Sequence, residues 1–239
     1  MLRRSIGQHL LLIGSRPAPR LGMVSGALVS AIACSTGGLS VDVIAAATDP
    51  TDPVHVTIDA LQKVASAARN IAITVHRGND AALAALSGVA EFVEQRARSA
   101  TPPVDNRIVL LLEPERLPSL LRSRDPLSSD QSVALKYLRS TLSGGSLVGV
   151  HVVLASASMQ QLAGILDERR DLPNFIHRAS LQVTDDDSFL LFRNRRAASL
   201  QDPEDPVSMA LYADMETNAS FSFRPYAPLG KSAAVTMTS

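Results

Sequence analysis

Two residues near the start of the chain, Gly14 and Arg20, have the spacing of the first glycine and the basic residue of a phosphate-binding loop. The apolar run 9–13 precedes Gly14 and is typical of a buried parallel strand. Residues 21–33, rich in Ala, Leu, Val and Met, predict a helix directly after Arg20. A strand, a tight loop and a helix N-terminus together bind phosphate through backbone N–H groups. The residues expected to contact a nucleotide are Gly14, Ser15, Arg16, Arg20 and Leu21.

The chemistry of this loop departs from the usual pattern at three positions. Pro19 stands in place of a glycine and has no N–H to donate to a phosphate. Leu21 stands in place of a serine or threonine and has no hydroxyl for Mg²⁺. Arg20 stands in place of the lysine; its guanidinium either binds the β- or γ-phosphate or belongs to the surface of a proline-containing loop. The sequence therefore predicts the scaffold of a nucleotide site without its main catalytic groups.

A basic cluster near the end of the chain contains Arg193, Arg195 and Arg196, with Arg169 and Arg170 earlier in the sequence. Arginines contact the phosphates of double-stranded DNA through charge alone. A solvated helix end gives the same pattern, so both interpretations stay open. The 23 basic and 23 acidic residues balance, so any DNA binding depends on this local patch. Aromatic residues make up 4% and Trp is absent, which argues against a base-stacking surface.

Other kinds of site have less support in the sequence. Cys34 is the only cysteine, so the chain has no internal disulfide and no cysteine metal site. His151 lies inside an apolar strand, where a histidine is more often a hydrogen-bonded core residue than a ligand. No run reaches the roughly 20 apolar residues of a membrane span. The first strand begins within ten residues of Met1, which leaves little room for an anchor or a preceding domain. We therefore expect a cytoplasmic protein with no membrane segment.

The elements that must position these residues alternate between strands and helices. The predicted strands are 9–13, 41–47, 71–75, 107–112, 150–155 and 177–183, with 209–213 and 221–223 as a terminal antiparallel hairpin. The predicted helices are 21–33, 58–68, 80–98 with Asp80 as N-cap, 131–142, 159–169 and 187–193. Pro17 and Pro19 exclude regular structure over 15–20. This order predicts an α/β fold, with a mostly parallel sheet covered by helices on both faces. With 46% hydrophobic residues, we expect one domain over 1–239, with a flexible tail after about residue 228.

Four segments, taken in order, resemble the motor domain of the FtsK/SpoIIIE family in the HerA/FtsK superfamily. They are 9–14, 108–113, 149–156, which is the closest match, and 172–188. Glu94 and Arg96 are similar to an acidic and basic helix of the same family. The resemblance implies a RecA-like P-loop NTPase fold that binds ATP and Mg²⁺. It also implies assembly with other ATPase domains or subunits, in a ring or a tandem array that moves DNA or protein.

The resemblance also assigns roles at the ends of two strands. Glu113 matches an aspartate that reaches the water shell of Mg²⁺, which makes it the candidate metal ligand. Pro114 matches the glutamate that positions the attacking water, and Glu115 follows one residue later. Ser156 matches a threonine near the phosphates, while Ala157 matches a glutamine that senses the γ-phosphate. Either Glu113 and Glu115 serve catalysis from a rebuilt turn, or they are solvated carboxylates, and Ser156 bonds either phosphate or nearby backbone.

Arg178 matches an arginine that, in such rings, reaches the nucleotide of a neighbouring subunit. An arginine finger of this kind stabilises the charge that develops in the transition state. The alternative is an ion pair within the chain, with Asp185, Asp186 or Asp187 as the partner.

The departures from the family pattern fall on catalytic positions. We therefore expect a degenerate ATPase domain that binds ATP and Mg²⁺ weakly or not at all. It would act as a structural or regulatory member of a DNA- or protein-translocating motor. One alternative is an active ATP-dependent translocase of double-stranded DNA with a rearranged site. Another is a protein-binding module that keeps the fold and no longer uses nucleotides.

Overall fold

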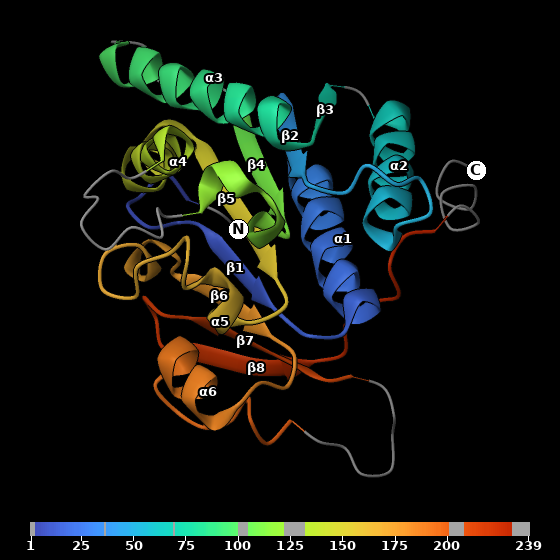
Figure 1. The fold of residues 1–239 in the computed structure, drawn as a ribbon, viewed down its shortest axis with the longest axis vertical. Helices are drawn as coiled ribbons and strands as arrows, with labels where there is room; N and C mark the ends of the chain where they lie inside the picture. The colour runs from blue at the N-terminus through green and yellow to red at the C-terminus, as the bar shows by residue number, and fades with distance from the viewer. Residues whose placement is uncertain are drawn as a thin grey trace.

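The structure is a computed structural model that describes residues 3–35, 37–68, 70–99, 105–121, 132–200 and 208–230. Its strands are β1 (Leu10–Ile13), β2 (Leu39–Ala45), β3 (Ile71–Arg77), β4 (Asn106–Leu112), β5 (Val150–Ser156), β6 (His177–Ser180), β7 (Ala210–Asp214) and β8 (Ala219–Phe223). They form one sheet in the order β3-β2-β4-β5-β1-β6-β7-β8 (Figure 1). β1 to β6 are parallel, and β7 and β8 add an antiparallel hairpin at one edge.

Helices cover both faces of the sheet (Figure 1). They are α1 (Pro17–Cys34), α2 (Pro53–Ala67), α3 (Asn79–Arg98), α4 (Val133–Gly144), α5 (Met159–Leu162) and α6 (Asp185–Phe192). Short 3₁₀ turns are η1 (Pro114–Arg116), η2 (Pro118–Leu120), η3 (Gly145–Val148) and η4 (Leu172–Asn174). Apolar residues of α1 and α2 pack on one face, and those of α3, α4, α5 and α6 pack on the other. The predicted α/β fold is confirmed.

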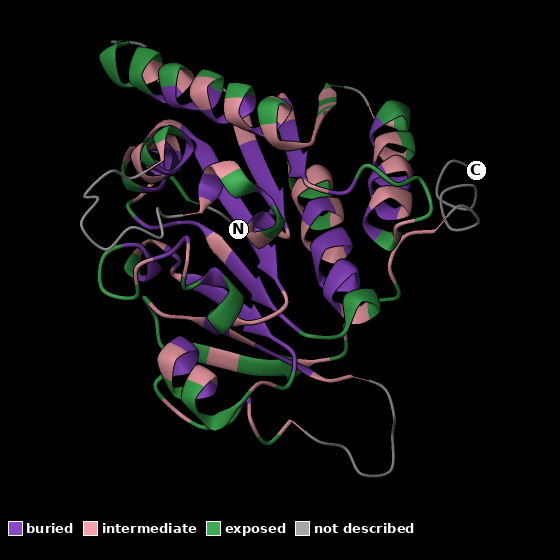
Figure 2. Cartoon of the chain, viewed as in Figure 1, coloured by how far each residue is buried: buried purple, intermediate pink, exposed green. Residues whose placement is uncertain are grey.

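The central strands are buried on both faces because alternate side chains enter the two cores. In β1, Leu12 packs toward α1, while Leu11 and Ile13 pack on the opposite face. Figure 2 shows this burial through the middle of the sheet and its loss at the edge strand β8. The chain leaves β1 toward β2 on one side and leaves β5 toward β6 on the other. Such a reversal opens a crevice at the carboxyl ends of the strands, where α/β folds bind ligands.

The start of α1 differs from the prediction. Residues 15–20 were expected to be irregular, but the helix begins at Pro17. The first N–H groups of a helix have no acceptor within it, so Pro17 and Pro19 remove no helical hydrogen bond there. Further along the helix, a Cβ at Gly22 would lie 1.9 Å from the carbonyl oxygen of Tyr226, so the segment after β8 crosses α1 at that point.

Three other helix predictions need correction. Asp80 is not the N-cap of α3; Gly78 is, with a φ of 83°, and Asp80 lies in the first turn. α2 begins at Pro53 rather than residue 58, because the Asp52 side chain accepts the N–H of Val54. The tail expected to be flexible after residue 228 lies mostly outside the described residues.

The third helix prediction that needs correction is the one over 159–169, because the helix α5 begins at Met159 and already ends at Leu162. Side chains bind the backbone beyond it and compete with helical hydrogen bonds. The Asp171 carboxylate accepts the N–H of Asp167 at 2.8 Å, and the Asp167 carboxylate accepts the N–H groups of Arg169 and Arg170. Arg139 of α4 donates two hydrogen bonds to Asp171 and holds this turn on the fold.

Among the described helices, α1 alone has the length and apolar composition that would suit a membrane span. The helix packs on the sheet through Leu21, Val24 and Leu28, all fully or almost fully buried. These residues place one face of α1 in the core, while 39% of the helix as a whole is buried.

Candidate functional site

The predicted site residues from three strands meet at the carboxyl edge of the sheet. The N–H of Gly14, after β1, donates to the carbonyl of Ser156 at 3.0 Å. The N–H of Glu113, after β4, donates to the carbonyl of Ala155 at 2.9 Å. Parallel pairing thus continues past the strand ends and brings Gly14, Glu113 and Ser156 to one place.

The connection from β1 to α1 is shorter than a loop that wraps a phosphate. Only Gly14, Ser15 and Arg16 lie between the two elements, and Arg20 falls in the helix. Pro17 and Pro19 occupy two of the first three helical positions, so these supply no N–H. The N–H of Arg20 is bonded to the carbonyl of Arg16 at 3.2 Å. The helix start therefore offers a phosphate few of the donors on which such sites depend.

Packing explains the glycine at the end of β1. A Cβ at Gly14 would lie 2.5 Å from the side chain of Leu181, which follows β6. Ser15 and Arg16 are exposed, and Arg16 donates to the hydroxyl of Ser208 at 3.3 Å. Leu21 is buried in the core beneath α1 and does not face the crevice. Gly14 and Leu21 thus serve the core in this structure.

Arg20 is the central residue of the site. Its guanidinium donates to the carbonyl of Gly14 at 2.6 Å and forms an ion pair with the Glu113 carboxylate. The Arg20 side chain is only 3% exposed, so the interpretation as a surface arginine is wrong. A buried guanidinium needs paired acceptors to offset its lost hydration. Arg20 finds them within the protein, and its charge is already matched.

Glu113 is held by a second arginine as well. Arg116 donates to the other oxygen of the Glu113 carboxylate at 2.7 Å and reaches Asp52 at 3.3 Å. Glu113 has a φ of 51°, a left-handed conformation that is strained for a side chain of this kind. The expectation of a solvated carboxylate is wrong, because its side chain is 16% exposed and paired twice. Arg116 was not predicted as a site residue, although it lies three positions after Glu113.

These neighbours do not fit a Mg²⁺ ion at Glu113. Two guanidinium groups on one carboxylate repel a divalent cation and occupy both oxygens that would ligate it. Within the described residues, no group of three or more His, Cys, Asp and Glu side chains could hold a metal. The residues present therefore do not form a magnesium site in this conformation.

Glu115 reaches the same place through the turn η1. Pro114 begins that turn, and Glu115 accepts the hydroxyl hydrogen of Ser156 at 2.9 Å. Its second carboxylate oxygen is buried, with no partner among the described residues. Burial raises the pKa of Glu115, and the charge of Glu113 adds a smaller rise. The site thus retains a carboxylate beside the end of β5, but the Ser156 hydroxyl is engaged with it.

Arg178 lies inside the fold. Its guanidinium donates to the carbonyls of Phe175 at 2.8 Å, Leu172 at 3.0 Å and Leu191 at 2.7 Å. Burial, followed by the charge of Arg193, lowers the pKa of Arg178 to about 10.

Both earlier interpretations of Arg178 fail in this conformation. Among the described residues it makes no ion pair with Asp185, Asp186 or Asp187, so that expectation is wrong. The side chain is buried, and its donors join η4 to the end of α6. A guanidinium held this way does not extend to a neighbouring subunit, and the arginine-finger role has no support in the structure.

The basic cluster lies at the end of α6. Arg193 has a left-handed backbone, with a φ of 57°, and ends the helix. Arg193, Arg195 and Arg196 are exposed, and Arg196 donates to the hydroxyl of Ser220 on β8 at 2.6 Å. The first turn of α6 carries three aspartates, so the two ends of this helix have opposite charge. DNA contact by the cluster stays a prediction.

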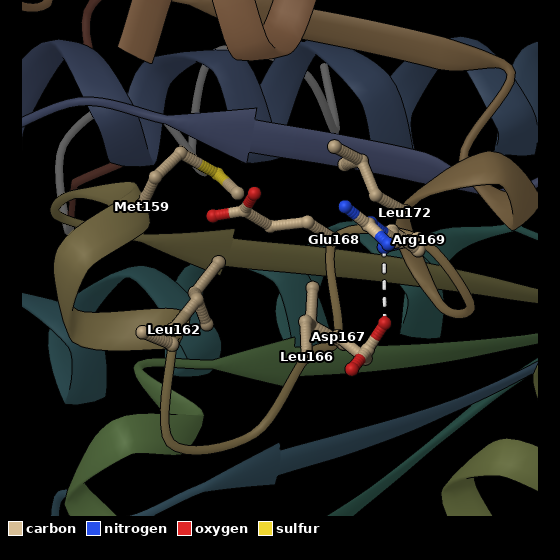
Figure 3. Close-up of a pocket in the computed structure, with 8 residues that line it drawn as sticks. Met159, Leu162, Leu166, Asp167, Glu168, Arg169 and Leu172 are labelled. Atoms are coloured by element: carbon tan, nitrogen blue, oxygen red, sulfur yellow. Dashed lines mark hydrogen bonds between the residues drawn. The ribbon is translucent and has the colours of Figure 1, made fainter. Parts of the chain in front are cut away.

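A cavity that the sequence analysis missed lies where α5 ends. Its volume is about 290 Å³. The lining residues drawn in Figure 3 include Met159, Leu162, Leu166, Asp167, Glu168, Arg169 and Leu172. The Arg169 N–H bonded to Asp167 at 3.0 Å shapes its rim. Its lining residues come from α5, from the turn that follows it and from η4.

Comparison with known proteins identifies the fold. No protein-family model and no curated protein sequence matches the chain. The cytoplasmic domain of the type VII secretion ATPase EccC from Thermomonospora curvata is similar in structure, with a TM-score of 0.61 and 12% identity. The pCW3 conjugation coupling protein TcpA, in its monomer form with ATPγS, has a TM-score of 0.61 and 12% identity. B204, the DNA-packaging ATPase of Sulfolobus turreted icosahedral virus, has a TM-score of 0.57 and 8% identity.

The three structures match most of this chain, but this chain matches very different shares of each of them. The alignments cover 98%, 92% and 95% of this chain, and 27%, 60% and 100% of EccC, TcpA and B204. The chain therefore spans less than two thirds of EccC and TcpA. It shares the fold of these ATPase domains, and this is the P-loop ATPase fold that the sequence resemblance implied.

Proposed function

We propose that this chain is an ATPase-fold domain that has lost nucleotide hydrolysis and acts as a structural or regulatory member of a translocating motor. The observation that carries the proposal is the Arg20–Glu113 ion pair, with Arg20 also bonded to Gly14. A phosphate needs an available cation and free N–H donors. Here the cation is neutralised, and two prolines remove donors at the helix start.

The residues at the position expected for Mg²⁺ support the same conclusion. Phosphoryl transfer depends on a metal that bridges the phosphates and on a group that orients the nucleophile. Glu113 is paired with two arginines, and Pro114 carries no carboxylate. We infer that any ATP or Mg²⁺ contact of this chain is weak and comes only after the ion pair opens.

The motor role is an inference from proteins with the same fold. The structures similar to this chain belong to a secretion ATPase, a conjugation coupling protein and a DNA-packaging ATPase. The chain matches only part of the first two, so partner ATPase domains, in tandem or in a ring, fit the proposal. A cytoplasmic location fits the similarity to the cytoplasmic domain of EccC.

One observation favours a second candidate, an active ATPase with a rearranged site. Glu115 places a buried carboxylate with a raised pKa beside Ser156. In that case ATP would draw Arg20 away from Glu113, and Glu115 would take the role of the general base.

The test is binding and hydrolysis of ATP by the whole chain, with and without Mg²⁺. We expect no saturable binding at millimolar nucleotide, and turnover far below the roughly 1 s⁻¹ at the lower end for working enzymes. Glu115→Gln is compared with Glu94→Gln, a matched change in an exposed ion pair of α3. Turnover near 1 s⁻¹ that Glu115→Gln abolishes and Glu94→Gln retains would establish the second candidate instead.

A further inference from the structure

A second cavity lies at the amino ends of the parallel strands, at the opposite end of these strands from the candidate site. Its volume is about 360 Å³. It lies between the last turns of α1 and the first residues of β1, β2, β4 and β6, on the face of the sheet that α1 and α2 cover. Leu28 and Ala31 of α1 line it on one side, and Leu10, Leu39, Ile108 and Val153 of the sheet line it on the other.

The lining selects for a neutral molecule. Among the described residues that line it there is no Asp, Glu, Lys or Arg, and most of the side chains are apolar. The polar side chains include two histidines, His151 and His177. Burial lowers the pKa of both, so they are neutral imidazoles at pH 7. A charged ligand would lose its hydration against this mostly apolar lining, which supplies no charged side chain of its own among the described residues.

His151 lines this cavity and has one ring nitrogen left to accept a hydrogen bond. The residue is 2% exposed, and its Nδ1 lies 2.8 Å from the carbonyl oxygen of Gln8. A carbonyl only accepts, so Nδ1 carries the hydrogen of the neutral ring and Nε2 carries the lone pair. No described residue forms a hydrogen bond with Nε2.

The neighbouring buried histidines are satisfied at both nitrogens. His9 donates from Nε2 to the carbonyl of Leu142 at 2.9 Å and accepts the N–H of Val152 at Nδ1, also at 2.9 Å. His177 donates from Nε2 to the Gln8 side-chain oxygen at 2.8 Å, and its Nδ1 accepts the Tyr212 hydroxyl at 2.7 Å. Buried polar atoms are normally paired. Among these three rings, only His151 has an acceptor that calls for a partner from the cavity.

We propose that this cavity is a binding site for a small, neutral, mostly apolar molecule with one hydrogen-bond donor, which His151 Nε2 accepts. A phenol is the simplest member of this class. The volume lies within the range of about 300–1,000 Å³ found for small-molecule sites. A mostly apolar lining with a few polar groups is also the common composition of such sites, and here the polar groups are His151, His177, Tyr212, Asn106, Ser30 and Ser35.

The experiment compares p-cresol with toluene, which differ only in the hydroxyl donor. Binding to the whole chain is measured by ligand-observed NMR. Cys34 lines the cavity, is exposed and is the only cysteine, so its rate of reaction with a thiol reagent reports occupancy. We expect p-cresol to bind with a dissociation constant on the order of 1 mM and to slow Cys34 modification. Toluene should bind roughly 2- to 10-fold more weakly, since it lacks one hydrogen bond.

Three variants separate the contributions to binding. His151→Leu should reduce p-cresol affinity to that of toluene. Ala31→Phe fills the cavity from α1 and should abolish the binding of both probes. Ala33→Phe is the matched control on the same helix, since Ala33 is exposed and does not line the cavity, and it should bind both probes like the wild type.

Three outcomes would contradict the proposal. Equal affinities for p-cresol and toluene in the wild type would show that His151 accepts nothing from the ligand. Binding that survives in Ala31→Phe would place the site elsewhere. Absence of binding by either probe would mean that only water fills the cavity and pairs with His151, which overturns the proposal. Ala31→Phe keeps the test decisive if His151→Leu does not fold.

Discussion

Arg20 and Glu113 form a buried ion pair between the start of α1 and the end of β4, at the edge where a P-loop ATPase binds nucleotide. The same guanidinium holds the carbonyl of Gly14, so one side chain joins two strand ends. Arg20, which the motif spacing assigns to phosphate binding, is therefore bound to groups of this fold itself.

Arg20→Ala should destabilise the protein by about 2–3 kcal/mol. Breaking a buried pair leaves an uncompensated charge and typically costs 3–5 kcal/mol, but Glu113 keeps Arg116 as a partner and is partly exposed. Urea unfolding of Arg20→Ala, Glu113→Gln and the double variant measures the coupling in a double-mutant cycle. Arg98→Ala, which removes an exposed pair with Glu94, is the control and should change stability by less than about 0.5 kcal/mol. Additive single effects at Arg20 and Glu113 would contradict the ion pair.

Arg178→Ala should destabilise the protein by about 3 kcal/mol or more. Its removal leaves the carbonyls of Phe175, Leu172 and Leu191 without their donor inside the fold, and each such loss costs about 1–3 kcal/mol. Arg178→Lys should rescue only part of this, because one ammonium cannot span the three acceptors that the guanidinium fork reaches. Thermal unfolding is the measurement. Arg193→Ala, an exposed arginine nearby, is the control with little expected change. Normal stability of Arg178→Ala would restore the arginine-finger interpretation.

We expect the contribution of Glu115 to the free energy of unfolding to fall as pH rises. Its pKa in the folded protein is raised above the ordinary 4.5, so the folded state binds its proton more tightly than the unfolded state does. The stabilising contribution is complete below about pH 4.5 and is lost as pH rises through the folded pKa. Glu115→Gln should therefore be more stable relative to the wild type at pH 7 than at pH 4.

The measurement is urea unfolding of both proteins across this range, and their difference cancels the titration of other groups such as His9. A Glu115→Gln difference that does not depend on pH would show that the carboxylate is not desolvated in the fold. Glu94→Gln provides the exposed control.

The fold class, and the strands and helices in their order along the chain, followed from the sequence because apolar runs and helical periodicity are local signals, whereas the order of the strands in the sheet was not predicted. Gly14, Glu113 and Ser156 were singled out one by one, and the structure brings them together because parallel strands have their carboxyl ends on one side of the sheet. The ion pair did not follow from the sequence, because Arg20 and Glu113 are 93 positions apart and no spacing rule links them. Pro17 and Pro19 predicted a loop but serve as the start of a helix. Arg178 matched a catalytic position in sequence, but its burial and its carbonyl partners are set by η4 and α6 in three dimensions.

The last prediction concerns DNA and the basic cluster of Arg193, Arg195 and Arg196. The cluster is exposed at the end of α6, but Arg196 already donates to Ser220, and the other end of the helix carries three aspartates. The chain is neutral overall, so only local charge favours DNA. We expect weak, sequence-independent binding of duplex DNA at low salt and none near physiological salt.

Three to four phosphate contacts predict a slope of log affinity against log salt of about −3 to −4. Fluorescence anisotropy of a labelled duplex at several salt concentrations gives that slope. Changing the three arginines to Glu should abolish binding, while Arg98→Glu, an exposed arginine on α3, should leave it intact. If the wild type does not bind DNA even at low salt, the cluster is a solvated helix end. If the triple variant binds as well as the wild type, the DNA contacts lie on another surface, because three reversed charges at the true site would repel the phosphates strongly.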